Sequence, residues 1–455
     1  MCVVNYVKIN RSQIAMRCAA GALLLAVISP SVLGADLLEV YRQAQGNDPA
    51  FEAARHGFEA AQEKFPQARA GNLPTVNLTG NENFTDEKAG FNGAAPVNRG
   101  IYAWTWTLQL TQPIIRLQNV YAYKESQALV EAAQAEYAQA EQDMILRVAQ
   151  AYFDVLVAQE TIATAEAQLR AMREQEEAAK RGYELGTMSI TDSHEARSKA
   201  ELARSQLSVA QNELDTKLTE LEKLTGKPSD KLAGLKPTVV APKPEPPDVG
   251  KWVEQAKGYN PAVLAQQASL RAAGFTVTKA RAEHMGTLDF VASYGSNYSS
   301  GSVAMPTGFE TRGKSSVTGL QFSMPIFAGG LSSSHIREAV ANQGKLGAQL
   351  EMARRKAGAE AKQAYAGIVN GLSQTEALQS AVESGESSVK GNQAGYKHGL
   401  RINSDVLNAQ QQLFASKRDL AKARYDTLLE GLKLKAAAGV LSELDVVVIN
   451  GLLAY

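Results

Sequence analysis

Side chains that commonly carry catalysis or bind metals are scattered in this sequence. The histidines are His56, His194, His284, His335 and His398. None of them has a second ligand at a metal-binding spacing such as His-x-x-x-His, so we expect surface or helix-capping roles for them. Gly329-Gly330 lacks the Lys-Ser/Thr pair of a phosphate-binding loop. The sequence therefore predicts no catalysis, no cofactor and no metal.

The N-terminal segment 1–34 has the features of a secretory signal peptide. Lys8, Arg11 and Arg17 precede an apolar run over positions 18–28, and small residues follow it. The run is too short for a membrane-crossing helix, which needs about 20 residues. We therefore expect segment 1–34 to be removed, with Met16 as an alternative start. Both cysteines, Cys2 and Cys18, lie in this segment, so the mature chain would contain no disulfide and no thiolate site.

The charge balance gives no reason to expect nucleic acid as a partner. The chain has 47 basic and 47 acidic residues, and the leader removes three of the basic ones, which leaves 44 minus 47, or −3. A mildly acidic chain lacks the basic surface that binds a phosphate backbone.

The sequence is internally duplicated, because a series of landmarks recurs in the same order in its second half. The matching landmarks are Asp48-Pro49-Ala50 with Asn260-Pro261-Ala262, Leu108-Gln109 with Leu320-Gln321, Ala151-Tyr152 with Ala364-Tyr365, and Gly182-Tyr183-x-x-Gly186 with Gly395-Tyr396-x-x-Gly399. We predict a first repeat over residues 35–225, a second over 251–440, and a C-terminal equatorial segment over 441–455. The prolines within residues 226–250 predict an extended equatorial strap between the repeats, with a disordered linker as the alternative.

Long helices must position the Gly-Tyr-x-x-Gly motif that recurs in the two repeats. Residues 117–182 contain no proline and show apolar residues at spacings of three and four, as do residues 331–395. A continuous helix of about 65 residues would span about 100 Å at 1.5 Å per residue. Shorter partners follow at about 192–225 and 405–438. We therefore expect helical hairpins over about 117–225 and 331–438.

Four other segments alternate between apolar and polar residues, which is the pattern of amphipathic strands. They cover about residues 74–85, 101–112, 287–299 and 314–326. The face expected to contact lipid carries the aromatic residues Tyr102, Trp104, Trp106 and Phe322. A length of about 9 to 12 residues suits a tilted strand of an outer-membrane barrel, and a soluble sandwich is the alternative. Four strands cannot close a barrel, so copies of the chain would have to share one.

This order of elements resembles the TolC family across essentially the whole mature chain. The local sequence agrees at Leu108-Gln-Leu-Thr-Gln-Pro113, Ala151-Tyr-Phe-Asp-Val-Leu156 and Gly395-Tyr-x-x-Gly399. The resemblance implies a mixed fold in which a homotrimer builds one 12-stranded outer-membrane barrel, four strands per protomer, continuous with a periplasmic α-helical barrel. It also implies a periplasmic adaptor and an inner-membrane ABC or RND-type transporter as partners.

The resemblance places the candidate gate at the hairpin tips. The tip glycines are Gly182, Gly186, Gly395 and Gly399. Tyr396 and Arg401 match the family's latch residues, which bond to the neighbouring helical pair at the position of Asp192, with Thr191 beside it. Helix capping by Asp192, and by Ser404 or Asp405, is the alternative role.

The resemblance also implies a periplasmic constriction. Asp405 matches the first carboxylate of that ring. Asn408 stands where the family often has a second acidic residue, so the sequence predicts a weaker ring.

The function expected from these features is a passive outer-membrane exit duct for efflux or type I secretion. A structural periplasmic coiled-coil or adaptor protein is the main alternative, and it would lack the four membrane-length strands. A general porin is the second alternative, and it would need more strands in one chain.

Overall fold

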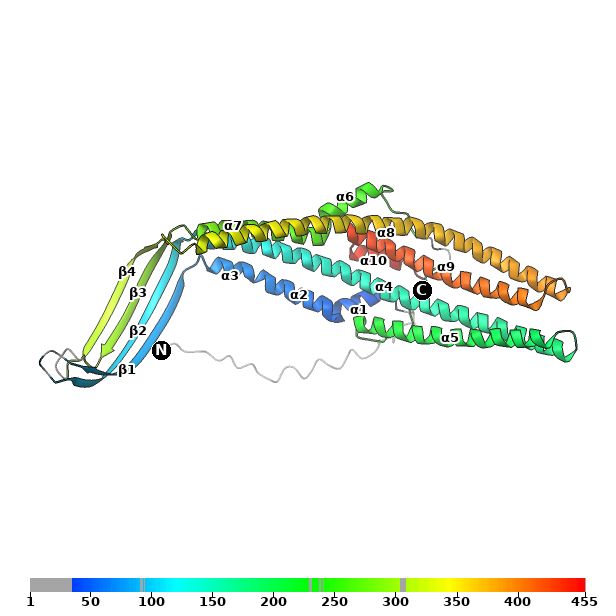
Figure 1. The fold of residues 1–455 in the computed structure, drawn as a ribbon, viewed down its shortest axis with the longest axis horizontal. Coiled ribbons are helices and arrows are strands. Elements are labelled where there is room, and N and C mark those ends of the chain that lie inside the picture. Colours follow the sequence, from blue (N-terminus) through cyan, green and yellow to red (C-terminus); the bar gives the residue numbers. More distant parts are fainter. Residues whose placement is uncertain are drawn as a thin grey trace, which may run out of the picture.

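The protein is elongated, with a β-sheet at one end and long helices over the rest of its length (Figure 1). The computed structural model describes residues 35–90, 93, 95–228, 231–236, 239, 241–302 and 308–454. The predicted signal peptide at 1–34 lies outside the described residues. So does part of the predicted strap, at residues 229–230, 237–238 and 240.

The two halves of the chain repeat one order of elements. The first half contains α1 (Leu37–Asn47), α2 (Pro49–Gln62), α3 (Lys64–Ala70), β1 (Thr75–Ala89), β2 (Val97–Ile115), α4 (Leu117–Glu184) and α5 (Ile190–Thr225). The second half contains α6 (Val249–Tyr259), α7 (Pro261–Ala282), β3 (Thr287–Ser299), β4 (Thr311–Ser323), α8 (Leu331–Lys397) and α9 (Asn403–Ala437). A short α10 (Glu443–Asn450) follows.

The repeated Asx-Pro-Ala landmark is a helix start. The Asp48 side chain accepts a hydrogen bond from the Ala50 amide at the start of α2, and Asn260 accepts one from Ala262 at the start of α7. In both helices proline occupies the first helical position. A backbone N–H there has no partner within the helix, so proline, which lacks this N–H, costs no hydrogen bond. The landmark is therefore a capping motif, used once in each repeat.

The four strands form one antiparallel sheet in the order β1-β2-β3-β4. Leu78 pairs with Leu108, and Leu108 with Tyr294, so these residues share one face. The polar face carries the alternate residues, such as Thr107 and Gly295. β1 and β4 are the two edges of the sheet.

The first two strands are longer than predicted, whereas the third matches its predicted bounds. β1 has 15 residues and β2 has 19, against 12 expected for each; β3 covers 287–299 as predicted, and β4 has the expected 13 residues but begins at Thr311 rather than near 314. The β1–β2 hairpin continues through a polar region in which Glu87 pairs with Arg99, and there the alternation that marks a buried face disappears. Glu82 interrupts the apolar face of β1. Its carboxylate has a partner there, since it accepts a 2.6 Å hydrogen bond from the Tyr102 hydroxyl.

An ion pair joins the sheet to the helices. The Arg116 side chain donates to both carboxylate oxygens of Asp289, with distances of 2.9 and 2.7 Å. Arg116 immediately precedes α4, and Asp289 lies on the polar face of β3. A bidentate pair of this kind fixes direction as well as distance. It therefore sets how the first long helix leaves the sheet.

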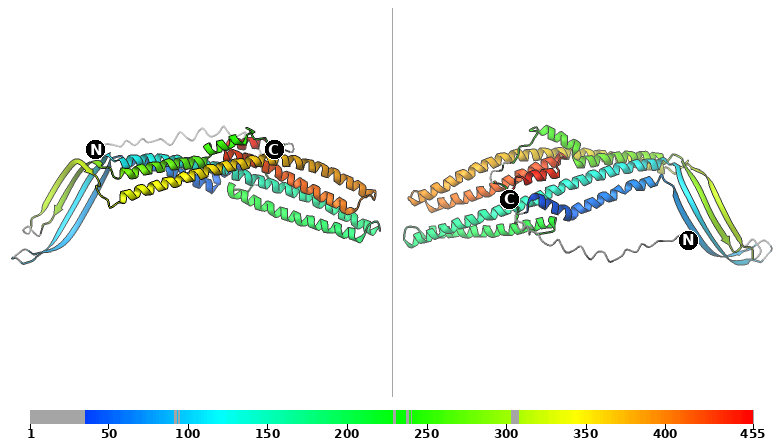
Figure 2. Two further views of the ribbon diagram at one scale, coloured as in Figure 1. Left: turned by 45° about the horizontal axis from the view of Figure 1, so that its top comes forward. Right: turned by 180° about the vertical axis from the view of Figure 1, so that it is seen from behind.

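The long helices agree closely with the predicted hairpins. α4 has 68 residues and α8 has 67, and each turns back into a partner of about half its length, α5 with 36 and α9 with 35. α4 packs along α5, and α8 along α9. Both hairpins end at the same end of the molecule, farthest from the sheet (Figures 1 and 2).

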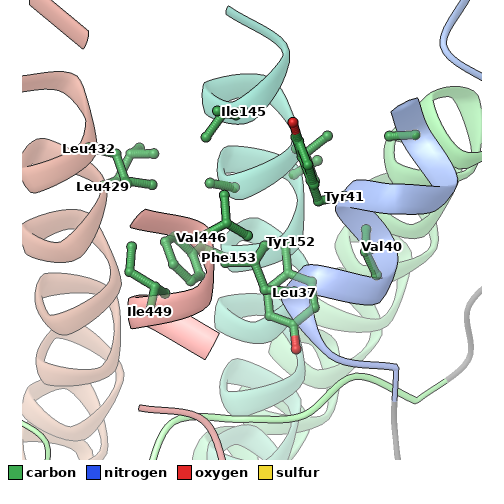
Figure 3. Close-up of a cluster of buried hydrophobic side chains, with 14 of the residues drawn as sticks. Leu37, Val40, Tyr41, Ile145, Tyr152, Phe153, Leu429, Leu432, Val446 and Ile449 are labelled. Atoms are coloured by element: carbon green, nitrogen blue, oxygen red, sulfur yellow. The ribbon is translucent and has the colours of Figure 1, made fainter. Parts of the chain in front are cut away.

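The main hydrophobic core lies part-way along the helices. Leu37 and Tyr41 of α1, Tyr152 and Phe153 of α4, Leu429 of α9 and Val446 of α10 meet there (Figure 3). The first and last helices of the described chain are thus packed against the middle of the first long helix.

Two equivalent tyrosines contact the segment between the repeats. The Tyr152 hydroxyl donates to the carbonyl oxygen of Ala233 at 2.7 Å, and the Tyr365 hydroxyl donates to that of Pro247 at 2.8 Å. Leu232 and Leu235 form isolated bridges with Ala35 and Leu453. The described part of this segment is therefore held in extended contact with the core.

Candidate functional site

The two hairpin tips close with the same backbone turn. At the first tip the Thr187 amide donates to the Gly182 carbonyl at 2.8 Å, and the Gly186 amide donates to Tyr183 at 3.0 Å. At the second tip Leu400 donates to Gly395 and Gly399 donates to Tyr396 at the same two distances. Gly186 and Gly399 have φ values of +68° and +73°. This is the glycine-terminated Schellman arrangement, which explains the spacing of the repeated motif.

The first glycine of each motif makes room for a returning side chain. A Cβ at Gly182 would lie 2.6 Å from the Met188 sulfur, and a Cβ at Gly395 would lie 2.8 Å from Cγ of Arg401. Met188 and Arg401 are equivalent positions, because each is the sixth residue after the first glycine of its motif. Each side chain therefore folds over the tip of its own hairpin.

The helix that follows the first tip begins at Ile190, about two residues earlier than predicted, so the capping prediction for Asp192 was wrong in detail. Ser189 is the N-cap, and its hydroxyl accepts from the Asp192 amide at 3.2 Å. The Asp192 carboxylate accepts from the Ser189 amide at 3.1 Å, which completes a capping box.

The predicted cap of the second short helix was also wrong. α9 begins at Asn403, and its N-cap position, Ile402, makes no side-chain capping bond. Ser404 and Asp405 therefore lie within the first turn of α9. Asp405 instead forms an ion pair with Arg401, with 3.6 Å between the guanidinium and the carboxylate.

Two of the predicted latch residues, Tyr396 and Asp192, lie near each other, and the bonds that Tyr396 and Arg401 make differ from the expected ones. Tyr396 donates from its hydroxyl to the Met188 sulfur at 3.1 Å, which links the two tips. Partial burial raises the pKa of Tyr396, and the nearby Asp192 carboxylate raises it further. Among the described residues Arg401 pairs with Asp405 and not with Asp192. Thr191 is exposed in the first turn of α5.

Behind the tips, one leucine joins the two hairpins. Leu407 of α9 is 0% exposed and packs with Leu169, Met172, Ala200 and Ala203 of α4 and α5. Beside it, the Gln175 amide donates to the Asn403 side-chain oxygen at 3.1 Å, and Lys199 donates to Gln411 at 3.1 Å. This contact, the Leu407 junction, holds α9 against the first hairpin.

The predicted constriction residues differ in exposure. Asp405 is half-buried beside Arg401, whereas Asn408 is exposed. The buried polar residues near them are Asn403, at the Leu407 junction, and Gln410. Sequence reasoning did not identify Met188, Asn403 or Leu407. Met188 could have been found, because the duplication aligns it with Arg401.

At the other end, the predicted aromatic face of the sheet is largely exposed. Tyr102, Trp106 and Phe322 are exposed, and Trp104 stacks on Tyr298 with ring centres 6.0 Å apart. Leu78 and Leu320 extend this face across the edge strands. A single chain thus presents a broad apolar sheet surface, with no layer from the described part of the chain over it.

The sequence profile of one protein family matches the chain twice, and this match identifies the family. The sequence profile of the family described as "Outer membrane efflux protein" matches residues 40–227 and again residues 252–440. The chain belongs to the outer membrane efflux protein family. The two matched segments correspond to the two structural repeats.

Other members of the outer membrane efflux protein family align over most of the chain. Outer membrane protein TolC of Escherichia coli (strain K12) is 30% identical over 92% of this chain and 85% of that protein. The alkaline protease secretion protein AprF of Pseudomonas aeruginosa is 29% identical over 93% of this chain and 88% of AprF.

Solved structures share the fold. The outer membrane protein VceC of Vibrio cholerae superposes with a TM-score of 0.75 at 20% identity, covering 89% of this chain and 96% of VceC. The Campylobacter jejuni CmeC outer membrane channel has a TM-score of 0.76 at 17% identity, with 90% and 86% covered. Among the residues described here, no helix combines the length and apolar composition needed to cross a bilayer.

Proposed function

We propose that the protein is a passive exit duct in the outer membrane, serving a tripartite efflux or type I secretion system. The observation that carries this function is the four-stranded sheet with two unpaired edges, one apolar face and one polar face. Edges of this kind cannot remain open in lipid, because unpaired backbone groups there cost several kcal/mol each. Three copies joined through β1 and β4 would close a 12-stranded barrel with its polar face inward.

The helices would continue this barrel through the periplasm. α4 and α8 begin at the sheet, and each is long enough to extend about 100 Å from it at 1.5 Å per residue. The Arg116–Asp289 pair supports continuity between the lumen-facing side of the sheet and the helical tunnel. Relatives whose names denote outer membrane efflux and protease secretion support both kinds of cargo.

The tips would form the gate. Tyr396 bonds across the two tips to Met188, Asp192 lies near Tyr396, and the exposed Arg401 has only a weak pair with Asp405. We propose that Arg401 reaches Asp192 or Thr191 of a neighbouring copy when the duct is closed. An exposed ion pair contributes only about 0 to 1 kcal/mol, so the latch could be opened by a partner. Three Asp405 carboxylates around the axis would favour cations.

The same tips would receive the periplasmic adaptor. Leu185 directly precedes the tip glycine Gly186, Leu400 directly follows the tip glycine Gly399, and both leucines are about four-fifths exposed. Exposed leucines at the end of a helical tunnel suit an apolar contact with an adaptor, which would connect the duct to an inner-membrane ABC or RND-type transporter.

Deletion of the gene, with complementation, tests the function. We expect loss of the protein either to abolish export of a secreted protein or to raise sensitivity to small toxic compounds. Full complementation by a chain that fractionates with soluble periplasmic proteins would contradict the proposal and favour the adaptor alternative.

A further inference from the structure

Two basic residues interrupt the apolar face of the sheet near its outer end. Arg312 and Lys314 are the second and fourth residues of β4. Arg312 pairs with Tyr298, which pairs with Trp104, and Lys314 pairs with Ser296. Residues that pair directly across strands share a face. Both cations therefore lie on the same face as Leu320 and Phe322, the face proposed above to contact lipid.

Their height on this face matches the outer membrane boundary. Arg312 is ten residues from Phe322 along β4. At about 3.3 Å per residue and a tilt of about 40°, this separation spans about 25 Å, the height of the apolar band of an outer-membrane barrel. Lys314 lies about 5 Å nearer the bilayer centre, within the distance that a lysine side chain can extend toward head groups.

The surrounding residues form a site of aromatic and cationic groups. The Arg312 guanidinium lies 5.3 Å from the centre of the Tyr298 ring, which stacks on Trp104. An open hollow of about 670 Å³ is lined by these residues together with Ser296, Asn297, Gly313 and Lys314. The small side chain of Ser296 leaves space between the aromatic pair and the lysine.

The charge of this hollow is not fully compensated. Arg312 is exposed, and its guanidinium lies 3.7 Å from the Glu310 carboxylate. Lys314 has no carboxylate within 4 Å in the part of the chain that the structure describes. A lysine on a lipid-facing strand without an acidic partner favours an anionic group from the membrane itself.

We propose that Arg312 and Lys314 bind the phosphate of a phosphorylated glycolipid in the outer leaflet, with Trp104 and Tyr298 beside its sugar. Arginine recognises phosphate through parallel hydrogen bonds, and lysine adds a point charge. This proposal rests on the proposed function, because it requires the sheet to span the outer membrane with its helices in the periplasm. The site would fix the height of the barrel against the head groups.

The competing occupant is an acidic residue of a second copy. Glu82 lies on the same face of β1, in the cross-strand row of Trp104, Tyr298 and Arg312. In a shared barrel β1 of one copy would adjoin β4 of the next. A Glu82→Gln variant distinguishes an ionic contact between copies from a lipid site.

The experiment measures lipid binding to the purified full chain by native mass spectrometry. Wild type is first required to conduct ions in a planar bilayer, because a failure at that step contradicts the proposed function rather than the lipid site. Lipid A and its dephosphorylated form are then titrated, with inorganic phosphate as a competitor. The variants are Lys314→Gln, Arg312→Gln/Lys314→Gln, Glu82→Gln and Lys88→Gln. Lys88 lies on the same face of β1, beyond the aromatic row.

We expect wild type to prefer phosphorylated lipid A, and each glutamine at 312 or 314 to reduce that preference about fivefold. Glu82→Gln, Lys88→Gln and millimolar inorganic phosphate should leave it unchanged. An unaltered preference in the double variant would overturn the site. An equal loss of this preference in Lys88→Gln would indicate general charge attraction. Displacement of lipid A by inorganic phosphate would indicate a free-anion site. If the trimer dissociated to the same extent in Glu82→Gln and in the double variant, the residues would form an ionic contact between copies. Each of these three results contradicts the proposal.

Discussion

Met188 and Arg401 occupy equivalent positions in the two repeats, yet their side chains bond to different kinds of partner at the tips. Met188 accepts a hydrogen bond from Tyr396, whereas Arg401, in the turn before α9, pairs with Asp405 in the first turn of that helix. The duplication therefore supplied one backbone turn twice, and the side chains at its returning position diverged. Asp192 serves both as the acidic member of a capping box and as a neighbour of Tyr396.

The two roles of Asp192 can be separated by a matched pair of variants. Ser189→Ala removes the hydroxyl cap, at a cost of about 1 kcal/mol, but leaves the carboxylate in place. We expect Asp192→Ala and Arg401→Ala to raise single-channel conductance in a planar bilayer, because each would remove a partner of the proposed latch, and Ser189→Ala to leave it unchanged. If Ser189→Ala raises conductance as much as Asp192→Ala, Asp192 acts only as a cap.

A buried tyrosine predicts how stability depends on alkaline pH. Burial raises the pKa of Tyr425 to about 12, and the Glu160 carboxylate adds to the effect. The unfolded chain releases this proton near pH 10 and the folded chain only near 12. The contribution of Tyr425 to stability is therefore constant below pH 10 and falls between pH 10 and 12, by up to about 3 kcal/mol at 1.36 kcal/mol per unit.

Thermal unfolding followed by circular dichroism at pH 9 and pH 11.5 measures this loss. Tyr425→Phe should reduce the drop in melting temperature between the two conditions. Tyr183→Phe, at the exposed first tip, should leave it as in wild type. An identical drop in Tyr425→Phe and wild type would show that the Tyr425 hydroxyl does not cause it.

At the scale of elements, the Leu407 junction joins the hairpins behind their tips. At the opposite end of each hairpin, a glycine in the left-handed conformation follows the short helix. Gly226 and Gly439 terminate α5 and α9 with φ values of +69° and +74°. These are equivalent positions of the repeat. We therefore expect the Leu407 junction to limit any movement of the tips, while the other ends of the short helices are packed in the core.

Leu407→Ala tests the junction. Truncating a fully buried leucine costs about 2–5 kcal/mol, and here the loss should loosen the first half of α9 from α4 and α5. We expect faster amide hydrogen exchange between residues 403 and 415 and a higher conductance. Leu400→Ala removes an exposed leucine nearby and should change exchange in this segment little. Equal exchange in the two variants would contradict the junction.

Gly439→Ala tests the packing at the C-terminal end of α9. A Cβ at Gly439 would collide with the carbonyl oxygen of Tyr259, whereas a Cβ at Gly399 would meet nothing within 4 Å. Both positions bear the cost of a left-handed conformation, about 1–2 kcal/mol. We expect Gly439→Ala to lower the melting temperature clearly more than Gly399→Ala. A similar shift in both would mean that the backbone contact at Tyr259 adjusts without cost.

The elements were more predictable from sequence than their side-chain partners. The unbroken stripe from Leu117 onward located α4 to within about two residues of its end at Glu184, because a long helix repeats its signal every turn. The polar extension of β1 past Phe84 was missed, because strands that bury neither face do not alternate. Ser189 was missed as a cap because the helix start was placed at Asp192. The Leu407 junction joins hairpins that belong to different repeats, and no local pattern reports a contact between segments so far apart in the chain.

In the whole molecule, the sheet of a single chain has two open edges, β1 and β4. Neither the long hairpins nor the core removes these edges. Closure by copies of the same chain would satisfy the backbone and join the sheets into one wall, which would impose the same symmetry on the helices. In the proposed trimer, the duplication within the chain would give that wall six similar units.

Counting the chains in the ion-conducting particle tests this closure most directly. The protein is extracted from outer membranes, its conductance is recorded in a planar bilayer, and the mass of the same preparation is measured by native mass spectrometry. We expect a conducting particle of three chains. A water-soluble single chain that conducts no ions would contradict the shared barrel, and with it the proposed duct.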